Sequence, residues 1–144
     1  MRLRFPLFLL ALGTCCLPGG CGKGISVPST NPVQGKVVLN GRPTAGIRVT
    51  FNPQFDMGKV KFLPSGTTDR EGRFVLSTAA ANDGAPAGEY AVTFAFPQIE
   101  SDRRNSGIEI EVDAWKGKYA DPAQSKYKVQ VRKGENNLEA FQLN

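Results

Sequence analysis

The sequence predicts an all-β domain, and three observations lead to this prediction. From Val33 onward, apolar residues recur with a period of two, as in strands that bury one face. No stretch shows a sustained helical period. Turn-forming residues interrupt the alternating runs about every 8–12 residues, which is typical of short strands in a sandwich. We therefore expect about seven strands in an antiparallel β-sandwich.

The first two strands are expected at residues 33–39 and 46–51. Both segments alternate apolar with polar side chains. Between them lies Asn40-Gly41, a pair that favours a tight hairpin turn. Residues 55–66 are compatible with a weak strand or with a loop.

A turn followed by a strand is expected at residues 68–78. Asp69 is placed to accept hydrogen bonds from nearby backbone N–H groups, and Gly72 supplies the positive φ that a tight turn requires. A calcium loop is the alternative for Asp69 and Glu71. Only two carboxylates are present there, without the EF-hand spacing, so the sequence favours structural turn residues and predicts no metal site.

Residues 83–96 predict a strand that is covered on both faces. Tyr90, Val92 and Phe94 alternate with small residues, which leave room for a second layer to approach. Residues 97–106 are polar and are expected to form an exposed loop.

Residues 108–113 alternate between Ile or Val and acidic side chains. We expect Ile108, Ile110 and Val112 to face the core and the acidic residues to face solvent at a sheet edge. Glu109 and Glu111 could form an acid–base pair, but two carboxylates on one solvated strand face more often have no catalytic role.

The C-terminal third predicts two further strands. Residues 113–125 show no clear period and are expected to form a loop or one helical turn. Residues 126–134 alternate again, and residues 136–144 form the last strand, with a bulge expected near Ala140.

The first 20 residues have the layout of a secretory leader. Arg2 and Arg4 precede an uncharged apolar run at residues 5–17. That run is too short to span a bilayer, which needs roughly 20 apolar residues. Cys21 follows Pro18-Gly19-Gly20, a stretch that suits a peptidase site. We expect residues 1–20 to be removed.

The three cysteines are Cys15, Cys16 and Cys21. A disulfide framework needs partners distributed along the fold, and here every partner is local. A zinc site needs about four ligands at suitable spacing, and the chain contains no histidine. A lipid attachment point is the third possibility, and an ordinary cleaved signal peptide whose thiols have no role is the alternative to it.

Charge and composition indicate a tether followed by one domain and argue against nucleic-acid binding. The net charge of +5 becomes +3 when Arg2 and Arg4 leave with the leader. The remaining Lys and Arg are scattered, which argues against a nucleic-acid surface. Residues 21–32 lack an apolar period and are expected to form a flexible tether. Residues 33–144 are enough for one domain with one core.

The stretch that ends at Cys21 resembles a bacterial lipoprotein signal peptide. This resemblance implies that Cys21 carries a diacylglycerol thioether. It also implies that the protein crosses the inner membrane and stays anchored to the envelope by its palmitate-type acyl chains. The match departs from the usual pattern at Pro18, where an aliphatic residue is common. Cleavage before Cys15 or Cys16 therefore stays open as an alternative.

Three ordered segments resemble carboxypeptidase regulatory-like domains. The segments are VQGKVVLNGRPTAGIRVTFNP, TDREGRFVL and GAPAGEYAVTF. The resemblance implies a transthyretin-like (prealbumin-like) Greek-key sandwich that acts as a non-catalytic module. Related transthyretin-like hydrolases use histidines and a C-terminal Tyr-Arg-Gly-Ser, and this chain has neither.

The expected function is therefore a non-catalytic, membrane-anchored structural or interaction module of the envelope, without a cofactor. The alternative is a module that binds a carbohydrate or protein ligand, with Trp115, Tyr119 and Tyr127 as candidate stacking residues. A Lys36–Asn136 or Lys36–Asn137 isopeptide bond and an enzyme are weaker alternatives. For an enzyme, the sequence lacks histidine and a G-x-S-x-G motif.

Overall fold

The computed structural model describes residues 28–58, 60–101 and 107–144. These residues form 13 short strands and no helix, so the expected all-β class is confirmed for them. Within the same ranges, no helix has the length and hydrophobicity to cross a bilayer. The expected leader, residues 1–20, and the three cysteines lie outside the described residues.

One sheet has four antiparallel strands in the order β11-β8-β4-β5. Their bounds are β4 Arg48–Pro53, β5 Ser65–Thr67, β8 Gly88–Ala95 and β11 Lys128–Val131. The two central strands, β8 and β4, pair over six residues. Of the two alternatives for residues 55–66, a weak strand near Val60–Leu63 or a loop, the structure shows no strand at residues 60–64. The next strand, β5, starts only at Ser65.

The second sheet is built around β2, Val33–Leu39. On one side it pairs antiparallel with β3, Arg42–Pro43, and β6, Arg73–Val75. On the other side it pairs with β12, Asn136–Asn137, and β13, Phe141–Leu143. Both of these C-terminal strands run parallel to β2, so the fully antiparallel prediction is wrong here. The hydrogen-bonded strand is interrupted between Asn137 and Phe141, close to the bulge expected at Ala140.

The first described strand lies before the expected domain boundary at Val33. The short strand β1, Thr30–Asn31, pairs antiparallel with β7, Ala85–Pro86. The backbone oxygen of Pro32 accepts a hydrogen bond from Asn136 N–H at 2.9 Å. The last residues of the range expected as a tether, 21–32, are therefore part of the fold.

Side chains from both sheets form one core. Val33 and Val37 from β2 and Phe141 from β13 meet Phe94 from β8 and Val49 from β4. The Phe94 and Phe141 rings contact edge to face, with centroids 5.3 Å apart. All residues from Tyr90 to Phe94 are buried, which confirms the expectation that this strand is covered on both faces. The two sheets are also linked at one side, where Ser65 and Ser77 exchange backbone hydrogen bonds of 3.0 and 2.8 Å.

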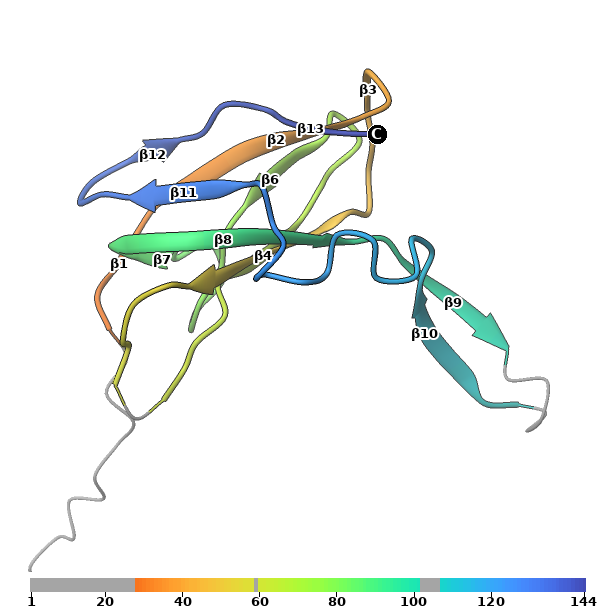
Figure 1. Cartoon of the computed structure of the whole chain (residues 1–144), viewed down its shortest axis with the longest axis horizontal. Helices are drawn as coiled ribbons and strands as arrows, with labels where there is room; N and C mark the ends of the chain where they lie inside the picture. Colours follow the sequence, from red (N-terminus) through yellow and green to blue (C-terminus); the bar gives the residue numbers. More distant parts are fainter. Residues whose placement is uncertain (1–27, 59, 102–106) are drawn as a thin grey trace, which may run out of the picture.

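Two strands leave this body as a β-ribbon (Figure 1). β9, Pro97–Ser101, pairs antiparallel with β10, Glu109–Asp113, and with no other described strand. The loop expected over residues 97–106 is therefore wrong for its first half. The prediction that Ile108 and Ile110 face the core is also wrong, because these side chains are 49% and 41% exposed. Among the residues that the structure describes, β10 pairs with one strand only, and no second layer covers Ile108 and Ile110.

Candidate functional site

The expected turn residues lie between β5 and β6. One carboxylate oxygen of Asp69, Oδ1, accepts N–H bonds from Glu71 at 3.0 Å and Arg73 at 2.8 Å. The other oxygen, Oδ2, accepts from Arg73 Nε at 3.1 Å. These donors, first of all the Arg73 backbone N–H, lower the pKa of Asp69 below its usual value. Asp69 therefore acts as the hydrogen-bond acceptor that shapes this turn.

Gly72 combines two constraints in the same turn. Its φ is +73°, a backbone conformation that residues other than glycine adopt only at a cost in free energy. Its backbone also lies against β2, where Val37 N–H donates to Gly72 O at 2.8 Å. A Cβ added at Gly72 would lie less than 3.0 Å from the Val37 carbonyl oxygen. The turn is thus held against β2 at a distance that only glycine allows.

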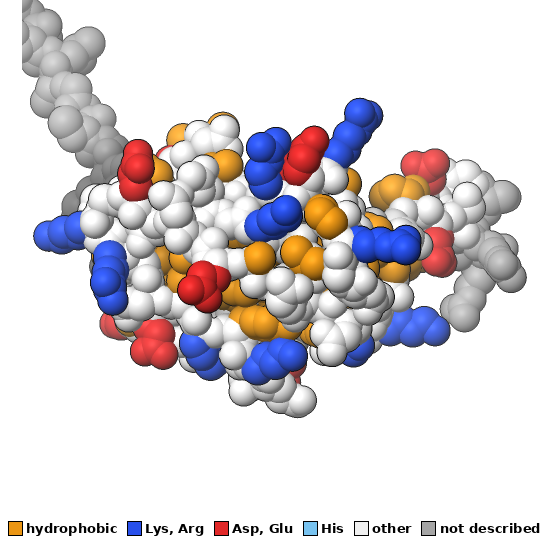
Figure 2. Space-filling view, turned by 90° about the horizontal axis from the view of Figure 1, so that it is seen from above, with side chains coloured by type: hydrophobic (Ala, Val, Ile, Leu, Met, Phe, Trp, Pro, Cys, Tyr) orange, Lys and Arg blue, Asp and Glu red, His pale blue; other side chains and the backbone are white. Residues whose placement is uncertain are grey.

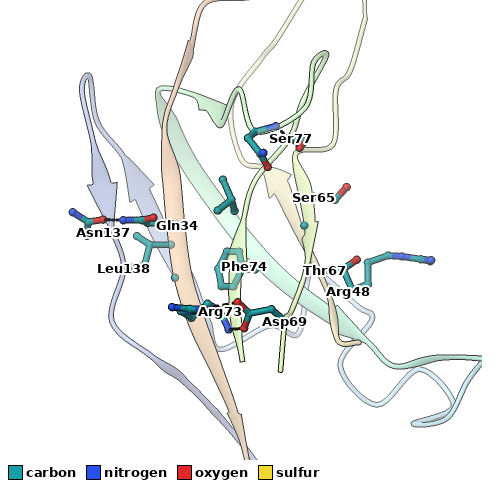
Figure 3. A pocket seen from close by; sticks show the side chains of 14 residues that line it. Gln34, Arg48, Ser65, Thr67, Asp69, Arg73, Phe74, Ser77, Asn137 and Leu138 are labelled. Atoms are coloured by element: carbon teal, nitrogen blue, oxygen red, sulfur yellow. Dashed lines mark hydrogen bonds and ion pairs between the residues drawn. The ribbon is translucent and has the colours of Figure 1, made fainter. Parts of the chain in front are cut away.

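A polar groove of about 960 Å³ lies beside this turn (Figure 3). Its wall includes the Asp69–Arg73 ion pair and the side chain of Gln34, which donates to Asn137 Oδ1 at 2.5 Å. Ser65 and Thr67 line the opposite wall. The charged groups in the groove are already paired with one another, so the groove presents mainly neutral hydrogen-bonding groups.

The three candidate stacking residues lie near one another and are partly buried against the core. Trp115 and Tyr119 contact edge to face with ring centroids 5.1 Å apart, and Trp115 also lies 5.5 Å from Phe96. Tyr127 contacts Phe94 at 5.2 Å between ring centroids. The structure therefore brings Trp115 and Tyr119 into direct contact, while Tyr127 packs separately on the core.

Both tyrosine hydroxyls are engaged with the C-terminal segment. Tyr127 Oη donates to Gln142 O, and Tyr119 Oη donates to Asn144 O. The chain between the two tyrosines loops away from β8, to which both ends are bonded through Val92 and Phe94 N–H. A hollow of about 300 Å³ remains inside the loop, lined by both tyrosines, by Lys118 and Lys126, and by Asp121, Gln124 and Ser125.

The hollow suits a small polar ligand better than a sugar ring that stacks on a tyrosine. Lys118 Nζ lies 4.9 Å from the centre of the Tyr119 ring, and Lys126 Nζ lies 5.1 Å from that of Tyr127. A sugar stacking on either ring would have to displace a lysine that already makes a cation–π contact there. Two cations and the nearby Asp121 give the hollow a mixed polar character.

An ion pair fixes the β-ribbon to the body. Arg48, at the start of β4, donates from both terminal nitrogens to Glu111, at 2.8 and 2.9 Å. Hydrogen bonding to Arg48 lowers the pKa of Glu111 and keeps it ionised. Glu111 is thus held as a carboxylate partner of Arg48. This arrangement favours an orienting role over the acid–base role considered for Glu109 and Glu111.

Asp113 is an organising residue that the sequence pattern did not indicate. Its carboxylate accepts three backbone N–H bonds: from Phe96 at 2.9 Å, from Trp115 at 3.1 Å and from Gly117 at 2.9 Å. Partial burial acts to raise the pKa of Asp113, but the three donors outweigh burial and lower it. The signal in the sequence is the same as at Asp69: an aspartate with a glycine three or four residues later.

The described residues contain no group of three or more His, Cys, Asp or Glu that could hold a metal ion. In the same ranges, every buried side-chain nitrogen or oxygen has a hydrogen-bond partner. Asn136, one candidate for an isopeptide bond, uses its amide to bond Arg132 O and Gly134 O at 2.9 and 2.8 Å. Its amide therefore shapes the turn between β11 and β12.

No family model and no curated protein matches the chain. Among solved structures, a 9R-lipoxygenase from Cyanothece PCC8801 is similar, with a TM-score of 0.44 and 16% identity. The match covers 87% of this chain and 18% of the lipoxygenase chain.

Proposed function

We propose that this protein is a non-catalytic, lipid-anchored envelope protein whose β-domain is an interaction module. The observation that carries the interaction role is the β-ribbon, which exposes Ile99, Ile108 and Ile110 to solvent at 63%, 49% and 41%. Ile108 and Ile110 share one face of this projecting two-stranded element, whereas Ile99 lies opposite Glu111 on the other face. Exposed large apolar side chains of this kind form a surface that partners cover.

The position of the β-ribbon supports a role away from the membrane. The described chain begins at Pro28, and β1 and the β-ribbon lie at opposite ends of the long axis (Figure 1). Six residues lie between Cys21 and Pro28, and the seven Cα–Cα steps allow a reach of at most about 25 Å. An anchor at Cys21 would hold the β1 end close to the lipid and present the β-ribbon outward.

The fold class supports the proposed family. We infer that the two sheets form a prealbumin-like Greek-key sandwich of the carboxypeptidase regulatory-like type. The three resembling segments contribute β2, β4, β6 and β8, which supply most of the shared core.

The anchor is tested by labelling cells with a palmitate analogue and separating the membranes. Cys21→Ser should abolish labelling and release the protein from membranes, whereas the matched Cys15→Ser and Cys16→Ser should change neither. Labelling that persists in Cys21→Ser and disappears in one of the other variants would move the anchor. Labelling in none of the proteins, wild type included, would refute it.

Ligand binding in the hollow beside Tyr119 and Tyr127 is the second candidate function. Its supporting observation is the 300 Å³ volume lined by two tyrosines and two lysines. For an anionic small molecule, Lys126→Ala should lose binding on a broad array. For a carbohydrate that stacks on Tyr127, Lys126→Ala should keep or strengthen binding, because the lysine no longer covers the ring. An array without signal would exclude the carbohydrate form of this proposal.

A further inference from the structure

Several strands of this protein have an edge without a partner strand among the described residues, and two of them, β10 and β11, complement each other. β10 pairs with β9 alone, and β11 pairs with β8 alone. An unpaired edge offers a row of backbone N–H and C=O groups to a further strand. The two edges have opposite charge and matching apolar faces, as the next observations show.

The backbone hydrogen bonds determine which residues face each open edge. Ala114 N–H donates to Phe96 O at 2.9 Å, so alternation turns the backbone groups of Glu109 and Glu111 away from β9. Val92 N–H donates to Tyr127 O at 2.9 Å. By the same alternation, the backbone groups of Lys128 and Gln130 in β11 point away from β8.

Antiparallel pairing of these edges places residues with outward backbone groups opposite each other. In every register that satisfies this rule, Glu109 and Glu111 lie on the same face as Lys126, Lys128, Gln130 and Arg132. Ile108 and Ile110 fall on the other face, where Ile110 meets Val129 or a residue two positions away, while Ile99 shares the face of Glu111. Backbone, charge and apolar requirements are thus met by one arrangement.

The net charges of the two segments also agree with this pairing. Residues 97–113 contain five acidic and two basic side chains, whereas residues 126–133 contain four basic and no acidic ones. Figure 2 shows red and orange side chains at the β-ribbon end and Lys and Arg side chains spread over the body. Attraction between these segments would favour encounter at low salt.

The two edges of one molecule do not meet. The β-ribbon points away from the body and from its own β11 (Figure 1). The solvent-exposed ion pair between Arg48 and Glu111 joins the β-ribbon to the β4 side of the body. The complementary edge is therefore available only on a second copy.

We propose that this protein associates with itself by strand addition, with β10 of one molecule pairing antiparallel to β11 of another. This inference rests on the interaction role proposed above and identifies the partner as a second copy of the chain. Pairing covers Ile108 and Ile110 and extends the four-stranded sheet of the second molecule by the β-ribbon.

A charge exchange between the two edges tests this pairing. The full-length chain is purified in a large excess of detergent micelles, so that two molecules rarely share one, and its association is followed by sedimentation velocity from about 1 to 200 µM. Wild type should self-associate, and more weakly at high salt. Glu109→Lys and Lys128→Glu should each weaken association by about tenfold, because each places like charges opposite each other at the interface.

The mixture is the decisive measurement. An equimolar mixture of Glu109→Lys and Lys128→Glu should regain association, because each edge then meets the opposite charge on the other variant. Glu139→Lys and Lys61→Glu are the matched controls, with the same charge changes at exposed positions outside the two edges. They should associate like wild type, and all variants should keep the wild-type unfolding midpoint.

A monomeric wild type over the whole range would overturn the inference, and so would a mixture that stays dissociated. Charge variants that associate as strongly as wild type would overturn it as well. These outcomes leave the membrane anchor untouched, because labelling of Cys21 is measured separately. Loss of labelling with intact self-association would refute the anchor alone.

Discussion

Three glycines allow the cost of backbone strain to be separated from the cost of steric overlap. Gly41 has a φ of +76° and no atom within 4 Å of an added Cβ. Gly66 lies outside the positive-φ region, but its added Cβ would come within 3.0 Å of the Val75 carbonyl oxygen. Gly72 has a φ of +73° and the same kind of overlap, with Val37 O. Alanine at each position therefore tests strain, overlap, and both together.

The expected losses follow from these geometries. Gly41→Ala should cost about 1 kcal/mol, the usual penalty of an alanine in the left-handed region. Gly66→Ala should cost about 1–3 kcal/mol, because β5 and β6 must separate to admit the methyl group. Gly72→Ala should lose about 2–4 kcal/mol, because it carries both penalties and disturbs the 2.8 Å bond from Val37 N–H.

Urea unfolding monitored by the fluorescence of Trp115 measures these losses as changes in the free energy of unfolding. The loss of unfolding free energy should be smallest for Gly41→Ala, larger for Gly66→Ala and largest for Gly72→Ala. If Gly72→Ala were no more destabilised than Gly41→Ala, the close approach of the turn to β2 would have no energetic weight. The steric part of the reasoning would then be refuted.

Two titratable residues give further predictions. Asp113→Ala should destabilise the protein by about 2–4 kcal/mol near neutral pH, because three backbone donors lose an ionised acceptor. The pKa of Asp113 is lowered in the fold, so its contribution is present above the unfolded value of about 3.9 and is lost as pH falls through the folded pKa. Urea unfolding at pH 7 and pH 3 measures the free energy of unfolding of Asp113→Ala and of wild type. The two free energies should differ less at pH 3 than at pH 7, and an equal difference at both pH values would contradict this. Burial raises the pKa of Tyr90 to about 12, so wild-type stability should fall as pH rises from about 10 to 12. Tyr90→Phe should lose about 1 kcal/mol at pH 7 with its 2.8 Å hydrogen bond to Pro86 O. The variant should also show a flatter alkaline decline, and an unchanged decline would assign the effect to other groups.

The central strands were predictable because their sequence and their surroundings agree. Val33 and Val37 alternate with polar residues, and both are buried. In β8, small residues opposite Tyr90 and Phe94 indicated correctly that a second layer covers the strand. Here the local pattern itself requires burial, since no exposed strand would carry so many large apolar side chains.

The β-ribbon was not predictable because a period of two does not identify what covers a strand. Ile108 and Ile110 alternate as regularly as the residues of β2, yet they lie in solvent. The direction of β12 and β13 was also hidden. Parallel pairing with β2 is set by the path of the whole chain and not by residues 136–144 alone.

The organising role of Asp113 could have been recognised in part. Asp69 and Asp113 both accept hydrogen bonds from the N–H groups two and four positions later. These two hydrogen bonds are local and can be predicted from the sequence. The bond from Phe96, which ties the base of the β-ribbon to the turn, depends on a contact across 17 positions and needs the fold.

The location of β2 has a mechanical consequence. It is the second strand from the N-terminal end of the described chain, after the two-residue β1, and it has bonded neighbours on both sides. A pulling force applied at Val33 acts along the strand, nearly perpendicular to the hydrogen bonds that hold it. These bonds would be loaded together in shear instead of opening one after another. A domain held by its N-terminus would thus resist extraction with its most connected strand.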